Sequence, residues 1–335
     1  MQVIIGLIMF MFLVLVHEFG HFAVAKLSGI KVNEFSIGMG PVLTQFTKNE
    51  TEYSIRLLPL GGYVAMEGED EESPDPRSYT NAKAYQKFLT ILAGPVMNLL
   101  TAFLIFAIIF GSIGVGSLTI ESVDQSSPAQ LAGLQAGDTI TKVEGKNVSS
   151  FAYIPKIIND SMTSGRESID IEYKRNGERI TAEKIVPEKV EGSYIVGFHV
   201  KKIEGFFGII KEAFLRVFFI MGLLWETLGS LFSGKLGLNA LSGPVGVVQQ
   251  VGNAASQGAA TLFMFLAVIS INLGFFNLLP IPALDGSKLL FIIVEKIMGR
   301  PLNKKFEQRV TIVGFVLLLG LIALVSIKDI YMLFK

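Results

Sequence analysis

Four long apolar runs constrain this chain more than any other feature of its sequence. They cover residues 2–27, 88–115, 259–279 and 310–327, and each suits a helix that crosses about 30 Å of hydrocarbon. Half of the 335 residues are hydrophobic and only 17% are charged. Because an ordinary soluble protein is less apolar than this, we expect a polytopic α-helical membrane protein with about four transmembrane helices.

Two segments have alternative interpretations. The first run lacks the basic start and the small-residue cleavage site of a signal peptide, so we interpret it as a retained span. Residues 205–235 are apolar but are interrupted by four charged side chains. We interpret that segment as an amphipathic helix lying on the lipid bilayer, with a fifth span as the alternative.

Basic residues predict the orientation. Lys26 and Lys31 follow the first span, Lys83 and Lys87 precede the second, and six basic residues separate the third span from the fourth. Since Lys and Arg gather on the cytoplasmic side, both of these connections should be cytoplasmic. The N-terminus, the stretch 116–258 and the C-terminus should then lie outside the inner (cytoplasmic) membrane. Lys plus Arg equals Asp plus Glu, at 29 each, so no basic excess indicates a nucleic-acid partner.

Residues 117–203 are polar and rich in strand and turn signals. Apolar residues alternate from Ile169 to Tyr173, and Asn176-Gly177 then predicts a hairpin turn. The stretch 126–148, "SSPAQLAGLQAGDTITKVEGKNV", resembles a PDZ domain of the bacterial protease type. That resemblance implies an inserted α/β domain that binds a peptide or chain end by strand addition. The alternative is a small α/β domain without a ligand, and we interpret the lone His199 as structural or solvated.

The most informative short stretch is "HEFGH", in which His17, Glu18 and His21 interrupt the first apolar run. On a helix His17 and His21 share a face, so both imidazoles can reach one metal ion, while Glu18 can act on a water as general base. Ionisable groups within a membrane span indicate function. The chain has no cysteine, so any metal ligand must come from His, Asp or Glu. Zinc is our expectation, although Fe or Co would accept such ligands.

A third ligand is expected near the end of the third span, in "NLLPIPALDG". Pro280 and Pro282 should break the helix there, and a broken backbone at membrane depth requires protein or a wet cavity around it. The segment should therefore fold inward and bring Asp285 to the two histidines. Asn277, in the same stretch, is a candidate for binding the substrate backbone or a developing oxyanion.

Together these motifs resemble the site-2 protease family of intramembrane zinc metalloproteases, in its bacterial RseP/RasP type with a single PDZ domain. The resemblance covers nearly the whole chain and includes four further stretches: "FSIGMGP" (35–41), "LPLGGYVAMEGE" (58–69), "AGPVMN" (93–98) and "LSGPVGV" (241–247). It implies zinc ligands at His17, His21 and Asp285, a catalytic base at Glu18 and a substrate-positioning residue at Asn277. Many members have Gly-His where this chain has Ser287-Lys288, which puts only the local surroundings of Asp285 in doubt.

The expected architecture has four parts: a first membrane part (1–116), the PDZ domain (117–203), a surface helix with its connector (204–258) and a second membrane part (259–335). The first part should contain a cytoplasmic β-hairpin region at about 33–66. An exposed strand edge there could align a substrate beside the site, the alternative being plain hairpins.

The expected function is hydrolysis of peptide bonds in or near the transmembrane segments of single-pass membrane proteins. The resemblance implies anti-sigma factors or remnant signal peptides as substrates. Two alternatives remain open: a non-proteolytic membrane receptor or scaffold that works through its PDZ domain, and a different membrane zinc endopeptidase.

Overall fold

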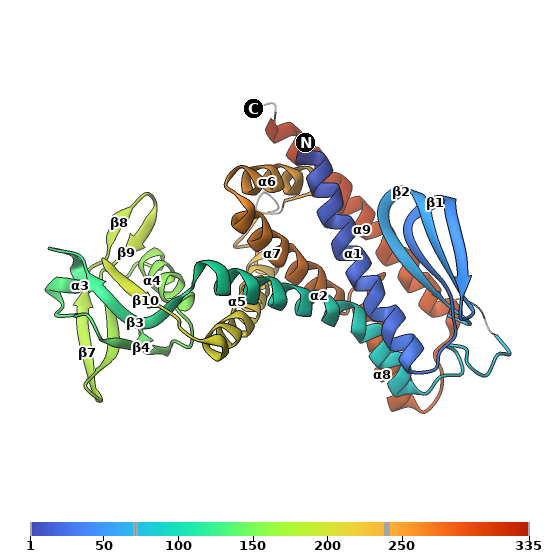
Figure 1. Cartoon of the computed structure of the whole chain (residues 1–335), viewed down its shortest axis with the longest axis horizontal. Helices are drawn as coiled ribbons and strands as arrows, with labels where there is room; N and C mark the ends of the chain where they lie inside the picture. Colours follow the sequence, from blue (N-terminus) through green and yellow to red (C-terminus); the bar gives the residue numbers. More distant parts are fainter. Residues whose placement is uncertain (1, 70, 72, 238–241, 334–335) are drawn as a thin grey trace. The chain divides into compact units, whose positions relative to one another are not determined.

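The computed structural model describes residues 2–69, 71, 73–237 and 242–333. The chain divides into two compact units, one formed by residues 1–105 with 223–335 and the other by residues 106–222. Each unit is described by itself (Figure 1).

Four helices of the described chain are long and apolar enough to cross a membrane, which confirms the expected number. They are α1 (Gln2–Leu27), α2 (Ala84–Ile113), α7 (Ala259–Leu278) and α9 (Lys304–Leu333). Two of them begin earlier than the apolar runs because polar side chains cap their first turns. The Gln86 side chain accepts a hydrogen bond from the Lys83 N–H, and the Asn303 side chain accepts one from the Lys305 N–H.

The shorter helices of this part are α6 (Pro244–Ser256) and α8 (Asp285–Met298). α6 begins in the "LSGPVGV" stretch, of which Leu241 lies outside the described residues. Asp329 of α9 caps the first turn of α6. One of its carboxylate oxygens accepts hydrogen bonds from the N–H groups of Gly243 (2.8 Å) and Gly246 (2.9 Å). This buried carboxylate satisfies backbone donors that the helix itself leaves free.

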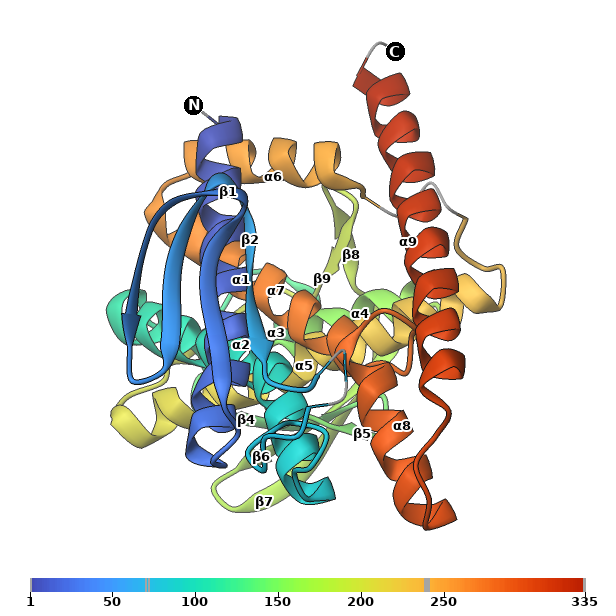
Figure 2. The ribbon, with the colours of Figure 1, turned by 90° about the vertical axis from the view of Figure 1, so that its right-hand side faces the viewer.

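The hairpin of the first unit consists of β1 (Val32–Lys48) and β2 (Thr51–Met66). Both strands bend, so Phe35 pairs with Val64 on one side and with Tyr53 on the other. The two bent strands therefore form a sheet of four adjacent strand segments, in the order 62–66, 32–37, 51–56 and 42–48 (Figure 2). Gly38 and Gly61, at φ 88° and 83°, supply backbone conformations that other residues rarely adopt.

A partly buried charge network fixes the register of this sheet. Glu34 accepts hydrogen bonds from Ser54 Oγ (2.5 Å), Arg56 Nη2 (2.7 Å) and Tyr63 OH (2.5 Å). Burial opposes ionisation of Glu34, but these hydrogen bonds outweigh it and lower its pKa. Burial and the neighbouring Glu34 raise the pKa of Tyr63 to about 12. These hydrogen bonds connect three of the four strand segments.

The second unit is built around an antiparallel sheet in the order β10-β3-β4-β6-β7, with β5 paired to β4. Its strands are β3 (Gly116–Val123), β4 (Thr139–Val143), β5 (Lys146–Asn147), β6 (Ile169–Arg175), β7 (Glu178–Ile185) and β10 (Phe198–Lys202). Helices α3 (Pro128–Leu131) and α4 (Tyr153–Thr163) and the small pair β8 (Glu188–Val190) and β9 (Ser193–Ile195) complete the domain. The predicted turn is confirmed, with positive φ at both Asn176 and Gly177.

Helix α5 (Phe206–Phe232) is continuous and is not among the four candidate spans. Glu212, on α5, is 3% exposed and accepts a hydrogen bond of 2.5 Å from Ser150 Oγ. Arg216 lies one turn further along, 3.5 Å from the same carboxylate oxygen. Burial raises the pKa of Glu212. Two of the charged residues that interrupt the 205–235 segment are thus paired within their own unit.

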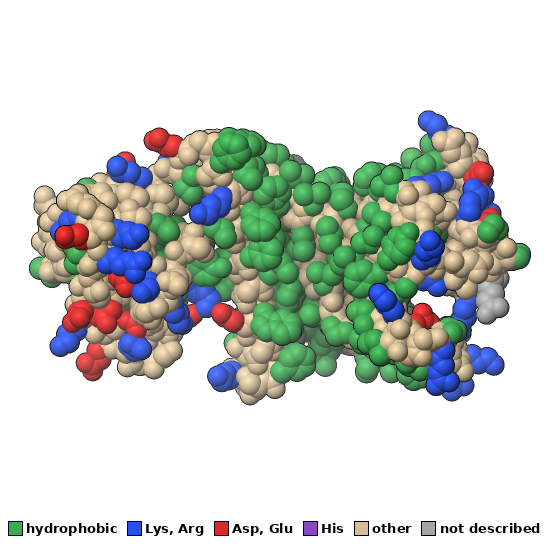
Figure 3. All heavy atoms as spheres, turned by 90° about the horizontal axis from the view of Figure 1, so that it is seen from below, with side chains coloured by type: hydrophobic (Ala, Val, Ile, Leu, Met, Phe, Trp, Pro, Cys, Tyr) green, Lys and Arg blue, Asp and Glu red, His purple; other side chains and the backbone are tan. Residues whose placement is uncertain are grey.

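Charged side chains are distributed unevenly over the surface. Figure 3 shows many of them on the strand-rich domain and others gathered at one end of the helical part, whereas hydrophobic side chains cover much of the rest of the helical part on this face. An apolar surface on long helices is what lipid requires of a multi-pass membrane protein.

Candidate metal centre

The two histidines of "HEFGH" lie one helical turn apart on α1 and point inward. His17 is 7% exposed and His21 is 6% exposed, whereas Phe19, on another face, is 48% exposed. The two ring centroids are 4.8 Å apart. The spacing i, i+4 thus brings both imidazoles to one buried point, as predicted.

Asp285 reaches the same point from a sharp turn. α7 ends at Leu278, the backbone passes Pro280 and Pro282, and α8 begins at Asp285. Gly286 permits this turn, because a Cβ there would overlap the carbonyl oxygen of Leu279. Asp285 Oδ2 lies 3.0 Å from His17 Nε2 and 3.3 Å from His21 Nε2.

These three side chains fit a divalent metal. One ligand atom from each lies within 4.8 Å of the others, and no other group of this kind occurs in the described chain. Asp285 Oδ2 is buried and has no conventional hydrogen-bond partner among the described residues. A carboxylate oxygen facing two imidazole lone pairs is repulsive without a cation, whereas two His and one carboxylate form a ligand set that zinc accepts.

Glycines bring α2 close to this cluster. A Cβ on Gly94 would overlap the His21 ring and lie 2.9 Å from Cε1 of His17. A Cβ on Gly20 of α1 would lie 2.8 Å from the carbonyl carbon of Ala93. Since neither site tolerates a methyl group, the two helices pack with backbone against backbone beside the histidines.

Both imidazoles have a partner on α2 at their other ring nitrogen. His21 Nδ1 is 2.8 Å from the carbonyl oxygen of Thr90, and His17 Nδ1 is 3.2 Å from the Asn98 amide. Such outer contacts orient ligand histidines. The sequence does not mark Thr90, Gly94 and Asn98 as site residues, although the motif "AGPVMN" contains the last two.

Glu18 is only partly buried, and its side chain makes no hydrogen bond or ion pair with any described residue. The edge segment of the sheet, residues 62–66 of β2, lies beside Glu18, since a Cβ on Gly62 would be 3.9 Å from Glu18 Cγ. Its carboxylate is therefore free to act on a bound molecule. Asn277 lies in the last turn of α7 and is partly buried, and its side chain makes no hydrogen bond to the described chain, so its role stays a prediction.

The unusual Ser287-Lys288 pair is accommodated locally. Ser287 Oγ donates to the carbonyl oxygen of Leu284, and Lys288 Nζ donates to Glu69 Oε1, both at 2.8 Å. Glu69 belongs to the acidic stretch 67–75, "EGEDEESPD", a composition that by itself predicts a solvated loop. Part of it is instead engaged, because hydrogen bonds from Ser73, Asn33 and Lys31 lower the pKa of Glu67 to about 2. Residues 70 and 72 lie outside the described chain.

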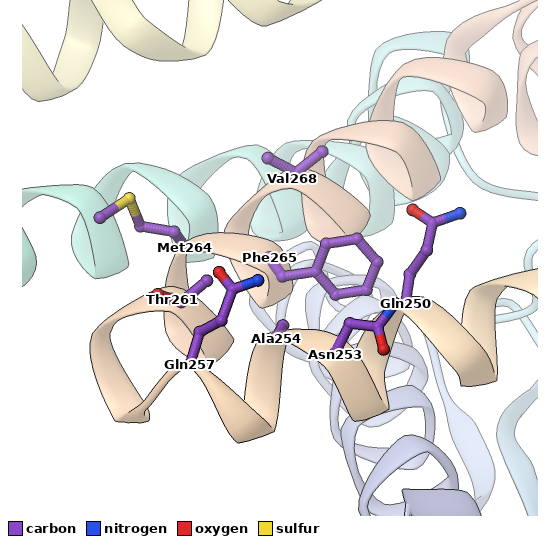
Figure 4. A pocket seen from close by; sticks show the side chains of 8 residues that line it. All are labelled: Gln250, Asn253, Ala254, Gln257, Thr261, Met264, Phe265 and Val268. Carbon is purple, nitrogen blue, oxygen red and sulfur yellow. The ribbon is translucent and has the colours of Figure 1, made fainter. Parts of the chain in front are cut away.

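A separate open groove lies between α6 and α7 (Figure 4). Its polar lining consists of the amides of Gln250, Asn253 and Gln257 and the hydroxyl of Thr261. The other lining residues are apolar, and none titrates or offers an imidazole or carboxylate to a metal. The groove is distinct from the histidine cluster, and we assign it no chemistry.

Comparison with known proteins matches residues 5–321 to peptidase family M50. A protein of Clostridium acetobutylicum whose name assigns it to the zinc metalloproteases is 37% identical over 98% of this chain and 97% of its own length. A protein of Fusobacterium nucleatum with the same assignment is 33% identical over the full length of both chains. A solved PDZ domain of an SdrC-like protein from Listeria monocytogenes matches 27% of this chain and 92% of its own, at 23% identity and a TM-score of 0.21. That last similarity is too low to assign the fold of residues 117–203. The sequence relatives are sufficient for the family: the chain belongs to peptidase family M50, the site-2 protease family that its motifs resemble, and is a zinc metallopeptidase.

Proposed function

We propose that this metallopeptidase hydrolyses peptide bonds in or near the transmembrane segments of single-pass membrane proteins. One observation carries the proposal: His17 and His21, on an apolar helix long enough to span the membrane, meet Asp285 directly after another such helix. Buried ionisable groups of this kind are costly in lipid unless they serve a function. The family resemblance suggests anti-sigma factors or remnant signal peptides as substrates.

In this proposal His17, His21 and Asp285 hold the zinc. When bound, zinc would supply Lewis-acid chemistry and lower the pKa of a coordinated water from about 15.7 toward ~7. The short distances between the three donor groups support this assignment. Two neutral imidazoles and the single Asp285 carboxylate would leave a bound Zn²⁺ with one net positive charge.

Glu18 is the general base. It takes one proton from water while the water oxygen bonds to the peptide carbonyl carbon, and it gives that proton to the amide nitrogen as the C–N bond breaks. Its freedom from hydrogen bonds and ion pairs supports this role. Asn277 is the residue we propose for orienting the scissile peptide, through its side-chain amide.

A substrate helix must unwind before its carbonyl groups become accessible, because they are hydrogen-bonded within the helix. Residues 62–66 form the edge segment of the sheet, which within the described chain pairs only with residues 32–37. The proximity of Gly62 to Glu18 supports a role for this edge in aligning an extended substrate by main-chain pairing. Residues 117–203, outside the membrane, would screen substrates or bind a newly cut chain end as a PDZ domain does.

The test uses purified protein with a model single-pass substrate, and the chain offers a matched control because it has three histidines. His17→Ala should lose zinc and cleavage, whereas His199→Ala, at an exposed histidine outside the cluster, should keep both. Mass spectrometry should map the cut to the transmembrane segment, and a substrate trimmed of its outer domain should be cut faster. Cuts confined to soluble loops would contradict an intramembrane substrate, and zinc binding by His17→Ala would contradict the ligand assignment.

A further inference from the structure

The proposed chemistry gives no role to Asn98, whose buried side-chain amide lies beside the metal cluster. Asn98 is 0% exposed, and its Nδ2 lies 3.2 Å from His17 Nδ1. Its Oδ1 has no hydrogen-bond partner among the described residues. A buried amide with one end beside a ligand histidine and the other end unpaired is costly unless it serves the site.

The other ligand histidine shows what such a partner does. His21 Nδ1 faces the carbonyl oxygen of Thr90 at 2.8 Å, and a carbonyl can only accept. The ring proton of His21 must therefore sit on Nδ1. The lone pair of Nε2 is then left to face Asp285 and a metal. The tautomer of His21 is thus set by α2.

His17 needs the same tautomer, since its Nε2 also faces Asp285. If Nδ1 of His17 carries the proton, it would face Nδ2 of Asn98, which is also a donor. The acceptor Oδ1 of Asn98 would meanwhile have no partner among the described residues. Half a turn of the amide exchanges oxygen and nitrogen in nearly the same space. Oδ1 then accepts the proton of His17 Nδ1, a repulsive contact becomes a hydrogen bond, and one amide group is left unpaired in either orientation.

The backbone around Asn98 is anchored, so the amide is held against His17. Ser270 Oγ, on α7, donates a hydrogen bond of 2.8 Å to the Asn98 carbonyl oxygen, and Ser270 is fully buried. Four residues further along α7, a Cβ on Gly274 would lie 2.8 Å from the carbonyl oxygen of Pro95. α7 thus packs closely on the turn of α2 that carries Asn98.

We propose that Asn98 is a positioning residue for the metal: its side-chain oxygen accepts the Nδ1 proton of His17 and so directs the Nε2 lone pair to the ion. This inference rests on the proposed metal site. It adds a requirement at α2 that the ligand set alone does not contain. Loss of such an outer partner lowers metal affinity by about 10- to 100-fold.

The experiment measures zinc affinity by competition with a chromophoric chelator, and records the visible spectrum of the cobalt-loaded protein. Asn98→Ala should weaken zinc binding by about 10- to 100-fold and alter the cobalt spectrum. Asn98→Asp should retain wild-type affinity, because a carboxylate accepts the Nδ1 proton but cannot donate. Thr101→Ala is the matched control on the same helix, since among the described residues its hydroxyl donates only to the carbonyl oxygen of Met97.

Each outcome has a separate meaning. Equal affinity in wild type, Asn98→Ala and Thr101→Ala would overturn the role of Asn98 and leave the metal site intact. Loss of affinity in Asn98→Asp as large as in Asn98→Ala, with both variants folded by thermal unfolding, would overturn the acceptor assignment. Absence of zinc binding in wild type would instead contradict the proposed function.

Discussion

Gly94 fixes how closely α2 approaches the two ligand histidines. A Cβ at this position would overlap the His21 ring and lie 2.9 Å from Cε1 of His17. The His21 ring cannot move aside freely, because its Nδ1 is held by the carbonyl oxygen of Thr90. Packing at this one residue therefore controls the geometry of the metal ligands.

Gly94→Ala should consequently lower zinc affinity by at least about tenfold and reduce cleavage in proportion. The added methyl group must displace either the His21 imidazole or the helix. Gly111→Ala is the matched control, because a Cβ at Gly111 of the same helix meets nothing within 4 Å. Chelator competition on both variants measures the difference, and equal zinc affinity would show that the close packing at Gly94 is unimportant.

At this scale the sequence points to ionisable candidate residues and gives little indication of neutral ones. His17, Glu18, His21 and Asp285 stand out because ionisable groups are rare in apolar runs. Asn98 lies 81 residues from its His17 partner, and its role depends on how two helices pack. Neither propensity nor periodicity contains that information.

Among the elements, α6 depends on another helix for the satisfaction of its first turn. No side chain of its own caps it, since the N-cap residue is Gly243. The Asp329 carboxylate supplies the acceptor for two N–H groups instead. This contact ties the "GPVGV" start of α6 to α9 within one unit.

Asp329→Leu should lower the free energy of unfolding by about 1–2 kcal/mol, the usual contribution of a capping acceptor. Asp329→Asn retains an amide oxygen in place of the bonding carboxylate oxygen and should be closer to wild type. Thermal unfolding in detergent measures both variants. Equal stability of the leucine and asparagine variants would contradict the capping role.

Element types follow from the sequence more readily than their pairing. The apolar runs predict the spans, and Asn176-Gly177 predicts the turn between β6 and β7. The folding of β1 and β2 into four adjacent strand segments is not predictable in this way. It depends on bends near Gly38 and Gly61 and on the hydrogen bonds to Glu34. Those contacts form only once the sheet exists.

For the whole molecule, the absence of cysteine allows a direct test of orientation. Single cysteines at Lys48 and Lys146 occupy exposed positions, the first in the hairpin and the second in the strand-rich domain. The distribution of Lys and Arg predicts that the hairpin is cytoplasmic and the domain is outside. A membrane-impermeant maleimide should therefore label Lys146→Cys on intact cells and label Lys48→Cys only after lysis. The reverse pattern would invert the proposed topology.

The central claim is that Glu18 acts on water at a metal held by His17, His21 and Asp285. The most direct test is Glu18→Gln, which keeps the size of the side chain and removes its ability to take a proton. Purified Glu18→Gln should hold zinc like wild type, and cleavage of a model transmembrane substrate should fall by about 100-fold or more. Cleavage at the wild-type rate by the zinc-loaded variant would contradict the account.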